Sequence, residues 1–176
     1  NLIENIIFNI GMSELVSYWK AACPREVIIK PAFLNNEQIE WWKNLYYNGL
    51  GEFFWLNNIK TSKDEFMHIS SNSIKNWKTD KNEYANNILI PVGGGKDSVV
   101  SLELLKKNKN VIPFAINPRG AIFDTLKSAG FEENQFFIIN RYLDEQLLDL
   151  NSKGYLNGHT PFSSVVAFNT LLAAHL

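Results

Sequence analysis

The strongest constraint on the fold is a regular alternation of apolar and amphipathic segments in the second half of the chain. Apolar runs of strand length occur at residues 87–92, 110–117 and 135–140. Each run is followed by a segment whose apolar residues recur at helical spacing. Strands that alternate with such helices build βαβ units, so the sequence predicts a parallel sheet. The helices are expected at residues 97–108, 120–130, 143–154 and 160–176.

The first half of the chain is richer in aromatic residues and less regular. Residues 12–23 have helical spacing, and Ser13 is expected as the N-cap of that helix. Residues 26–31 and a short segment around 66–69 are expected as strands. A second helix is expected in residues 35–58, capped by Asn35 or Asn36 and broken at Gly49 and Gly51.

These patterns predict an α/β protein. Residues 86–176 are expected to form a parallel sheet with helices on both faces, preceded in residues 1–85 by a smaller, mainly helical and aromatic-rich region. The chain has 176 residues, a fair size for one domain with a smaller annex. It begins with Asn1 and stops inside a predicted helix, so we expect it to be a fragment, truncated within the second region.

Charge and cysteine content exclude several classes of function. The formal net charge of −1 suggests no general attraction to nucleic acid or to an anionic membrane surface. The single cysteine, Cys23, excludes a disulfide framework and a cysteine-rich zinc site within this chain, and it favours a reducing, cytoplasmic compartment. No apolar run approaches the ~20 residues needed to span a bilayer, and we expect no signal peptide.

The segment PVGGGKDSVVSLELL, residues 91–105, places a glycine-rich loop between a predicted strand and a predicted helix. Glycines let the backbone approach a ligand closely, and the helix N-terminus offers N–H groups and a positive dipole end. We therefore expect the loop to bind phosphate. Two common phosphate loops do not match. The nucleoside-triphosphatase P-loop requires Ser or Thr where Asp97 follows Lys96, and the dinucleotide loop requires glycine where Ser98 stands.

The loop resembles the Ser-Gly-Gly-x-Asp-Ser motif of the PP-loop superfamily, the ATP pyrophosphatases with an adenine nucleotide alpha-hydrolase-like sheet. Gly94, Gly95, Asp97 and Ser98 match the motif, and Gly93 stands where the superfamily usually has serine. The resemblance implies that the backbone amides and the serine hydroxyl hold the β- and γ-phosphates of ATP, and that Asp97 positions magnesium and pyrophosphate. The alternative is a tight glycine turn capped by Asp97 and Ser98.

The superfamily also implies a reaction class. Its members cut ATP between the α- and β-phosphates, adenylate an oxygen of a substrate, and release AMP and pyrophosphate. Backbone groups near Ile116, at the end of the second strand, would bind the adenine edge, or Ile116 is only a core residue. Lys96 either neutralises phosphate or faces solvent.

Four longer blocks narrow the resemblance. Within residues 11–176 they are NLYYNGLGEFFWLNN, LIPVGGGKDSVVSLELL, FAINPRG and GYLNGHTPFSSVVAFNTLLAAHL. They resemble the UDP-N-acetylmuramoyl-L-alanyl-L-glutamate epimerase family. The resemblance implies an enzyme that inverts the terminal L-glutamate of UDP-MurNAc-L-Ala-L-Glu during peptidoglycan precursor synthesis, with ATP and magnesium. Its partner is then a small-molecule substrate, with no nucleic acid and no membrane.

Epimerisation requires a group that removes the proton from the α-carbon of glutamate. His159 is the candidate base, because it lies in the glycine-containing loop NGHTP just before a predicted helix. It could equally line the substrate site or hydrogen-bond a helix end. Arg119 could bind a phosphate or a substrate carboxylate through its planar fork, or be an exposed turn residue. Asn157 is expected to contact the substrate beside His159.

Glu52, His68 and His175 are further candidates. Glu52 could be a second acid or base, or only a carboxylate at a helix end. His68 lies in a polar loop and His175 at the end of the last helix. The neighbouring aromatic residues are expected in a core rather than as a platform for a sugar; they are Trp41, Trp42, Tyr46, Phe53, Phe54 and Trp55.

Two other functions fit the same loop. Another ATP pyrophosphatase, such as an amide-forming synthetase or a tRNA-modifying enzyme, would share it. Binding of tRNA favours a basic surface and sulfur transfer favours cysteines, so the charge and the lone Cys23 argue against both. The second is a non-catalytic ATP-binding module. The presence of Asp97 and Ser98 argues against it.

Overall fold

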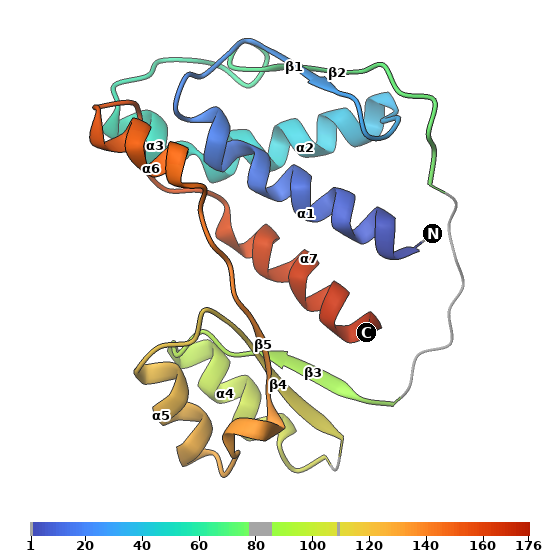
Figure 1. The fold of residues 1–176 in the computed structure, drawn as a ribbon, viewed down its shortest axis with the longest axis vertical. Coiled ribbons are helices and arrows are strands. Elements are labelled where there is room, and N and C mark those ends of the chain that lie inside the picture. The colour runs from blue at the N-terminus through green and yellow to red at the C-terminus, as the bar shows by residue number, and fades with distance from the viewer. Residues whose placement is uncertain (1, 78–85, 109) are drawn as a thin grey trace. The chain divides into compact units, whose positions relative to one another are not determined.

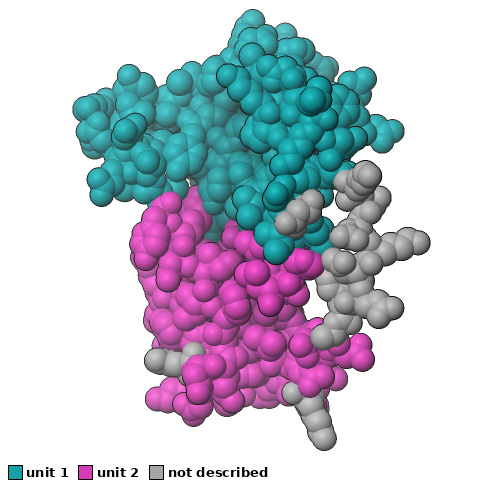
Figure 2. All heavy atoms as spheres, turned by 45° about the vertical axis from the view of Figure 1, so that its right-hand side comes forward, with its two compact units in different colours: residues 1–79, 143–165 teal, residues 80–142, 166–176 magenta. Residues whose placement is uncertain are grey.

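The structure is a computed structural model that describes residues 2–77, 86–108 and 110–176 (Figure 1). The chain divides into two compact units (Figure 2). The first unit contains residues 1–79 and 143–165, and the second contains residues 80–142 and 166–176. The predicted domain boundary near residue 85 falls at the edge of residues 78–85, outside the described residues, and it stays a prediction. Residues 143–165 cluster with the N-terminal residues and not with the strands that precede them.

The first unit is mainly helical, with one pair of parallel strands (Figure 1). In this pair Glu26 lies opposite His68 and Ile29 opposite Ser71. The second strand lies two residues later than the sequence predicted. The elements are α1 (Leu2–Trp19), β1 (Glu26–Ile29), α2 (Asn36–Gly49), α3 (Gly51–Leu56), β2 (His68–Ser71) and α6 (Glu145–Ser152), followed by α7 (Phe162–His175), of which residues 166–175 are assigned to the second unit.

The start of α2 is set by a capping box. The side chain of Asn35 accepts the N–H of Gln38 at 2.9 Å, and the side chain of Gln38 accepts the N–H of Asn35 at 2.9 Å. Two N–H groups without helical partners are thereby satisfied. The helix ends at Gly49 and α3 begins at Gly51, so the predicted cap at Asn35 and the predicted breaks are confirmed.

The predicted start of the first helix is wrong. Helix α1 begins at Leu2, and Ser13 lies inside it with 1% of its surface exposed. Apolar residues surround much of this helix, so the usual one-sided periodicity is weak. Ser13 is a small residue on a packed face, where burial overrides its preference for caps.

Aromatic side chains contribute several of the buried residues in the core of the first unit. Trp42, Tyr46, Phe53 and Phe54 are buried, as the sequence predicted. The hydroxyl of Tyr46 donates to the carbonyl of Met12 at 2.6 Å, and burial raises the pKa of Tyr46 above its ordinary value. The expectation of a core position is wrong for two residues, since 51% of Trp41 and 78% of Trp55 are exposed.

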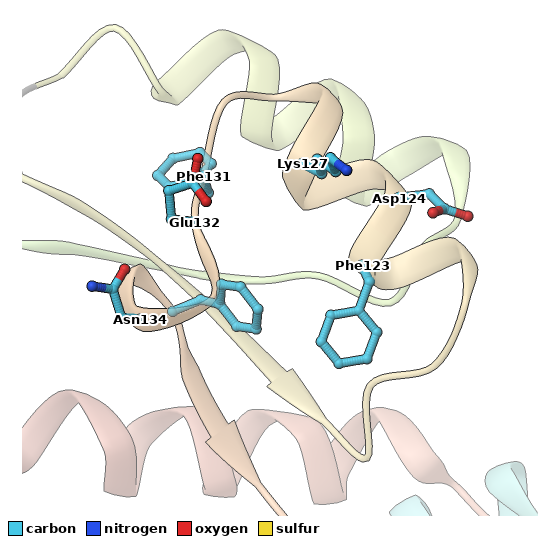
Figure 3. Close-up of a pocket in the computed structure, with 7 residues that line it drawn as sticks. Phe123, Asp124, Lys127, Phe131, Glu132 and Asn134 are labelled. Atoms are coloured by element: carbon cyan, nitrogen blue, oxygen red, sulfur yellow. The ribbon is translucent and has the colours of Figure 1, made fainter.

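The second unit contains a three-stranded parallel sheet in the order β3-β4-β5. Ile88 lies opposite Val111, and Phe114 opposite Phe137. Helices α4 and α5 cover one face, and residues 166–175 of α7 lie on the other (Figures 1 and 3). The elements are β3 (Ile88–Pro91), α4 (Lys96–Leu105), β4 (Val111–Ile116), α5 (Ala121–Ser128), a 3-10 turn at Glu133–Gln135 and β5 (Phe137–Ile139).

The core under α4 and α5 contains Ile90, Val92, Leu102 and Leu126, all at most 3% exposed. These residues come from the end of β3 and from two helices, so burial of their side chains holds the helices on the sheet. The α/β class with parallel strands is thereby confirmed. Over the residues that the structure describes, no helix is long and apolar enough to cross a membrane.

Candidate nucleotide-binding site and the histidine loop

The glycine loop, residues 93–95, joins β3 to α4 at the carboxyl edge of the sheet. The N–H of Val92 donates to the carbonyl of Phe114 at 2.7 Å, which fixes the start of the loop on the neighbouring strand. Gly94 has φ = +75°, and a Cβ placed there would lie 3.3 Å from Cγ1 of Ile122. A side chain at this position would therefore be strained and crowded, which explains the glycine.

The outer side of the glycine loop is open. A Cβ built at Gly93 or Gly95 would have no atom of the described residues within 4 Å. Gly95 is the N-cap of α4 and has no side chain to accept the N–H groups of the first turn. Those N–H groups and the positive dipole end of a ten-residue helix remain available to an anion.

The polar side chains of the motif have different local roles. The hydroxyl of Ser98 donates to the carbonyl of Gly95 at 2.8 Å, so it closes the first turn of α4. To donate to a phosphate, the hydroxyl would have to leave this carbonyl. The side chains of Lys96 and Asp97 are exposed, and Asp97 lies in the first turn, where a carboxylate interacts favourably with the helix dipole.

The end of β4 contributes a second part of this edge. Ile116 is half-buried and Arg119 is exposed. The turn that carries Arg119 leads into α5, whose residue Ile122 packs beside Gly94. The structure therefore brings the glycine loop and the Ile116–Arg119 turn to one edge of the second unit, as expected for carboxyl ends of adjacent parallel strands.

Asn117 links the ends of β4 and β5, a role that sequence reasoning missed. Its side chain donates to the carbonyl of Arg141 at 2.6 Å and accepts the N–H of Arg141 at 2.7 Å. Its own N–H donates to Ile139 at 2.9 Å, and its φ is +46°. The available signal was an asparagine directly after a strand and before a proline, a pattern typical of turns.

His159 lies in the first unit, in the segment 157–161 that we call the histidine loop. The side chains of Asn157 and His159 are exposed. The carbonyl of Asn157 accepts a hydrogen bond from the side chain of Asn57 at 3.2 Å, and the carbonyl of Gly158 accepts one from Lys20.

The remaining candidates gain no support from their surroundings. Glu52 is exposed in the first turn of α3, His68 is exposed at the start of β2, and His175 is half-buried at the end of α7. Within residues 2–77, 86–108 and 110–176, no group of three or more His, Cys, Asp and Glu side chains could hold a metal ion by itself. A magnesium ion carried by pyrophosphate, as the superfamily resemblance implies, requires no such group.

A cavity of about 580 Å³ lies elsewhere on the second unit, between α5 and the segment that leads to β5 (Figure 3). The rings of Phe123 and Phe136 meet there, with centroids 6.0 Å apart. Asp124 and Lys127 on α5 form one side of it (Figure 3). The described residues that line it include none of the predicted site residues.

Comparison with protein families gives a match over the full length of the chain. A family described as the MurL N-terminal domain matches residues 1–176, the whole of the chain. The chain belongs to this family. The family resemblance predicted from the sequence blocks is thereby confirmed.

Three curated relatives are each named UDP-N-acetyl-alpha-D-muramoyl-L-alanyl-L-glutamate epimerase. The relative from Micromonospora sp. is 35% identical over 90% of this chain and 34% of its own length. The relative from Salinispora tropica is 33% identical over 90% of this chain and 33% of its own length. The relative from Xanthomonas oryzae pv. oryzae is 30% identical over 92% of this chain and 35% of its own length. The chain thus spans about a third of the length of these relatives. No solved structure matches it.

Proposed function

We propose that the protein containing this chain is an ATP-dependent epimerase that converts the terminal L-glutamate of UDP-MurNAc-L-Ala-L-Glu to D-glutamate. The names of the curated relatives support the substrate and the reaction. The observation that carries the role of ATP is the glycine loop between β3 and α4, with an uncapped helix N-terminus and Asp97 in its first turn.

ATP has a clear chemical purpose in such a reaction. The α-hydrogen beside a carboxylate is a poor acid, because the carboxylate charge opposes formation of a second anion. Attack of a carboxylate oxygen on the α-phosphorus of ATP releases pyrophosphate and forms an acyl-adenylate, which removes that charge. The α-proton can then be removed and returned on the opposite face. Water finally releases AMP and restores the carboxylate.

The residues of the glycine loop fit a pyrophosphate group. The open space beside Gly93 and Gly95 lets a ligand approach the backbone, and the first-turn N–H groups of α4 would donate to phosphate oxygens. Asp97 would hold magnesium through the pyrophosphate, and Lys96 would add positive charge. Magnesium, when bound, neutralises charge on the transferring phosphates. Backbone groups near Ile116 would bind the adenine edge.

The remaining roles belong to the substrate side of the reaction. We assign proton transfer at the α-carbon to His159, and contacts with the substrate to Asn157 and Arg119. A guanidinium matches the geometry of a carboxylate or phosphate. The enzyme would act in the cytoplasm on a small molecule, without nucleic-acid or membrane partners. This proposal accords with the single cysteine and the net charge of −1.

The direct test uses the full-length protein with ATP, magnesium and UDP-MurNAc-L-Ala-L-Glu. We expect AMP and pyrophosphate to appear with substrate, and D-glutamate to be recovered after acid hydrolysis of the product. Substrate-dependent release of ADP and phosphate would overturn the pyrophosphatase assignment. Release of AMP without D-glutamate would point to another adenylating enzyme on the same fold. Binding of ATP without any turnover would point to a non-catalytic module.

A further inference from the structure

The histidine loop is held to the helices of the first unit by side chains far away in the sequence. Lys20, one residue past the end of α1, donates through Nζ to the carbonyl of Gly158. Asn57, one residue past the end of α3, donates to the carbonyl of Asn157 at 3.2 Å. These two carbonyls belong to the residues immediately before His159.

Close backbone packing holds the same loop on both sides of His159. A Cβ added to Gly158 would lie 3.2 Å from the ring of Phe53. A Cβ added to Gly49, at the end of α2, would lie 2.4 Å from Cβ of Pro161. Space for a single methyl group is therefore absent at one contact and scarce at the other, so the loop lies against α2 and α3 with little room to move.

Lys20 is unusual because it is almost fully buried. Only 4% of its surface is exposed, and its ammonium group lies 6.0 Å from the centroid of the Phe53 ring. Burial of a charged group is unfavourable unless specific partners compensate it. A second buried lysine of this unit, Lys43, lies within 4 Å of two carboxylates, Glu40 and Asp64. The ammonium group of Lys20 directs a charge-assisted hydrogen bond at the backbone of the histidine loop.

The hydrogen bond from Lys20 has a direct consequence for His159. The carbonyl of Gly158 and the N–H of His159 belong to one planar peptide group. Fixing that carbonyl fixes the plane, and with Phe53 and Asn57 it restricts the direction in which the imidazole leaves the backbone. A proton-transfer group loses much of its effect when it is displaced by about 1 Å.

We infer that Lys20 and Asn57 are positioning residues that hold His159 for proton transfer at the α-carbon of the substrate. This inference rests on the proposed function, because it concerns the base of that reaction. It adds that the N-terminal helical region sets the geometry of a loop 100 or more residues later in the chain.

The test compares Lys20→Met with wild type in the full-length protein. We measure release of AMP and, in heavy water, incorporation of deuterium at the α-position of glutamate. We expect AMP release within a few-fold of wild type, and a ratio of deuterium incorporation to AMP release that falls roughly 10–100-fold. A merely structural role would lower both activities together and leave the ratio unchanged, and this result would overturn the inference.

Lys43→Met is the matched control, because it removes a buried lysine of the same unit that is paired with carboxylates away from the loop. We expect its ratio of deuterium incorporation to AMP release to equal that of wild type. An equal fall of this ratio in both variants would overturn the specific role of Lys20.

If Lys20→Met does not fold, Asn57→Ala tests the inference, since it removes the second hydrogen bond from a partly exposed site. Its ratio should fall by a smaller factor, and an unchanged ratio would count against the inference.

Amide hydrogen exchange separates failure of this inference from failure of the proposed function. Exchange at residues 158–160 should become faster in Lys20→Met than in wild type and remain unchanged in Lys43→Met. If wild type incorporates no deuterium into substrate, the proposed function fails, yet faster amide exchange would still show that Lys20 holds the loop. Unchanged amide exchange in Lys20→Met would overturn the positioning role whatever the enzyme does.

Discussion

Asp97 and Ser98 are neighbours in the first turn of α4, but removing their side chains would test different properties. Ser98 closes the first turn through its bond to the carbonyl of Gly95, so its removal affects the helix as well as any ligand. Asp97 has an exposed carboxylate, and its removal should leave the fold intact. Asp97 is therefore the cleaner residue for a test of chemistry.

We expect Asp97→Asn to reduce substrate-dependent release of AMP at least about 100-fold, because the amide retains the size of the side chain but loses the charge directed at magnesium. The melting temperature should stay close to that of wild type. The control is Glu103→Gln, an exposed carboxylate near the other end of α4 that pairs with Lys106. Turnover at the wild-type rate in Asp97→Asn would remove Asp97 from its proposed role.

Replacement of His159 separates the two chemical steps, adenylation and proton transfer. His159→Gln should still release AMP and pyrophosphate, because adenylation requires only the phosphate machinery and water can intercept the activated carboxylate. Incorporation of solvent deuterium at the α-carbon should fall by ~10²–10⁴-fold, the usual effect of a positioned acid–base group. If both activities fall together, His159 binds substrate or nucleotide, and Glu52 becomes the next candidate base. If neither falls, His159 has only a structural role.

At the scale of elements, glycines decide how closely segments approach. Helix α2 ends at Gly49, where the helix meets Pro161 of the histidine loop. Gly94 allows the glycine loop to turn beside the first residues of α5. In both places a loop with a proposed function packs against a helix end, so its conformation depends on that contact.

We expect Gly49→Ala to lower the free energy of unfolding of the first unit by about 1–3 kcal/mol, because the new methyl group forces the loop and helix apart. Gly11→Ala is the control, since Gly11 lies inside α1 with no atom of the described residues within 4 Å of a Cβ there. We expect Gly11→Ala to raise the free energy of unfolding by about 0.5–1 kcal/mol. Tryptophan fluorescence during urea unfolding can measure the stability of both variants, because all 5 tryptophans of the chain lie in residues 1–79. Equal stability of both variants would contradict the packing argument.

At the scale of the whole molecule, charge distinguishes the proposed function from its nearest competitor. The chain carries 17 Lys and Arg against 18 Asp and Glu, which leaves a net charge of −1. Proteins that bind tRNA derive much of their affinity from contacts between basic side chains and phosphates. This balance gives the chain no general attraction for tRNA, in keeping with the small substrate that we propose for the protein.

We therefore expect tRNA to leave the release of AMP unchanged when it is added to full-length protein, ATP and magnesium at about 150 mM salt. The muropeptide precursor should stimulate the release under the same conditions. The control adds UDP-MurNAc-L-Ala, which lacks the terminal glutamate and should not stimulate the release of AMP. AMP release that depends on tRNA and not on the precursor would favour the tRNA-modifying alternative.

Local patterns were sufficient to predict much of this chain. The strands β3, β4 and β5, the helices between them, the cap at Asn35 and the breaks at Gly49 and Gly51 all lie where residue spacing and turn chemistry indicated. The glycine loop was recognisable because its residues are contiguous. These features depend on neighbours within a few positions, and such neighbours are visible in the order of residues.

Contacts between distant segments were beyond that kind of inference. The true start of α1, the exposure of Trp41 and Trp55, and the link from Asn117 to Arg141 depend on which surfaces meet after folding. The bond from Lys20 to Gly158 joins residues 138 positions apart. Periodicity records only that a face is apolar and does not specify its partner, so the support of the histidine loop by the N-terminal helices became apparent only from packing in three dimensions.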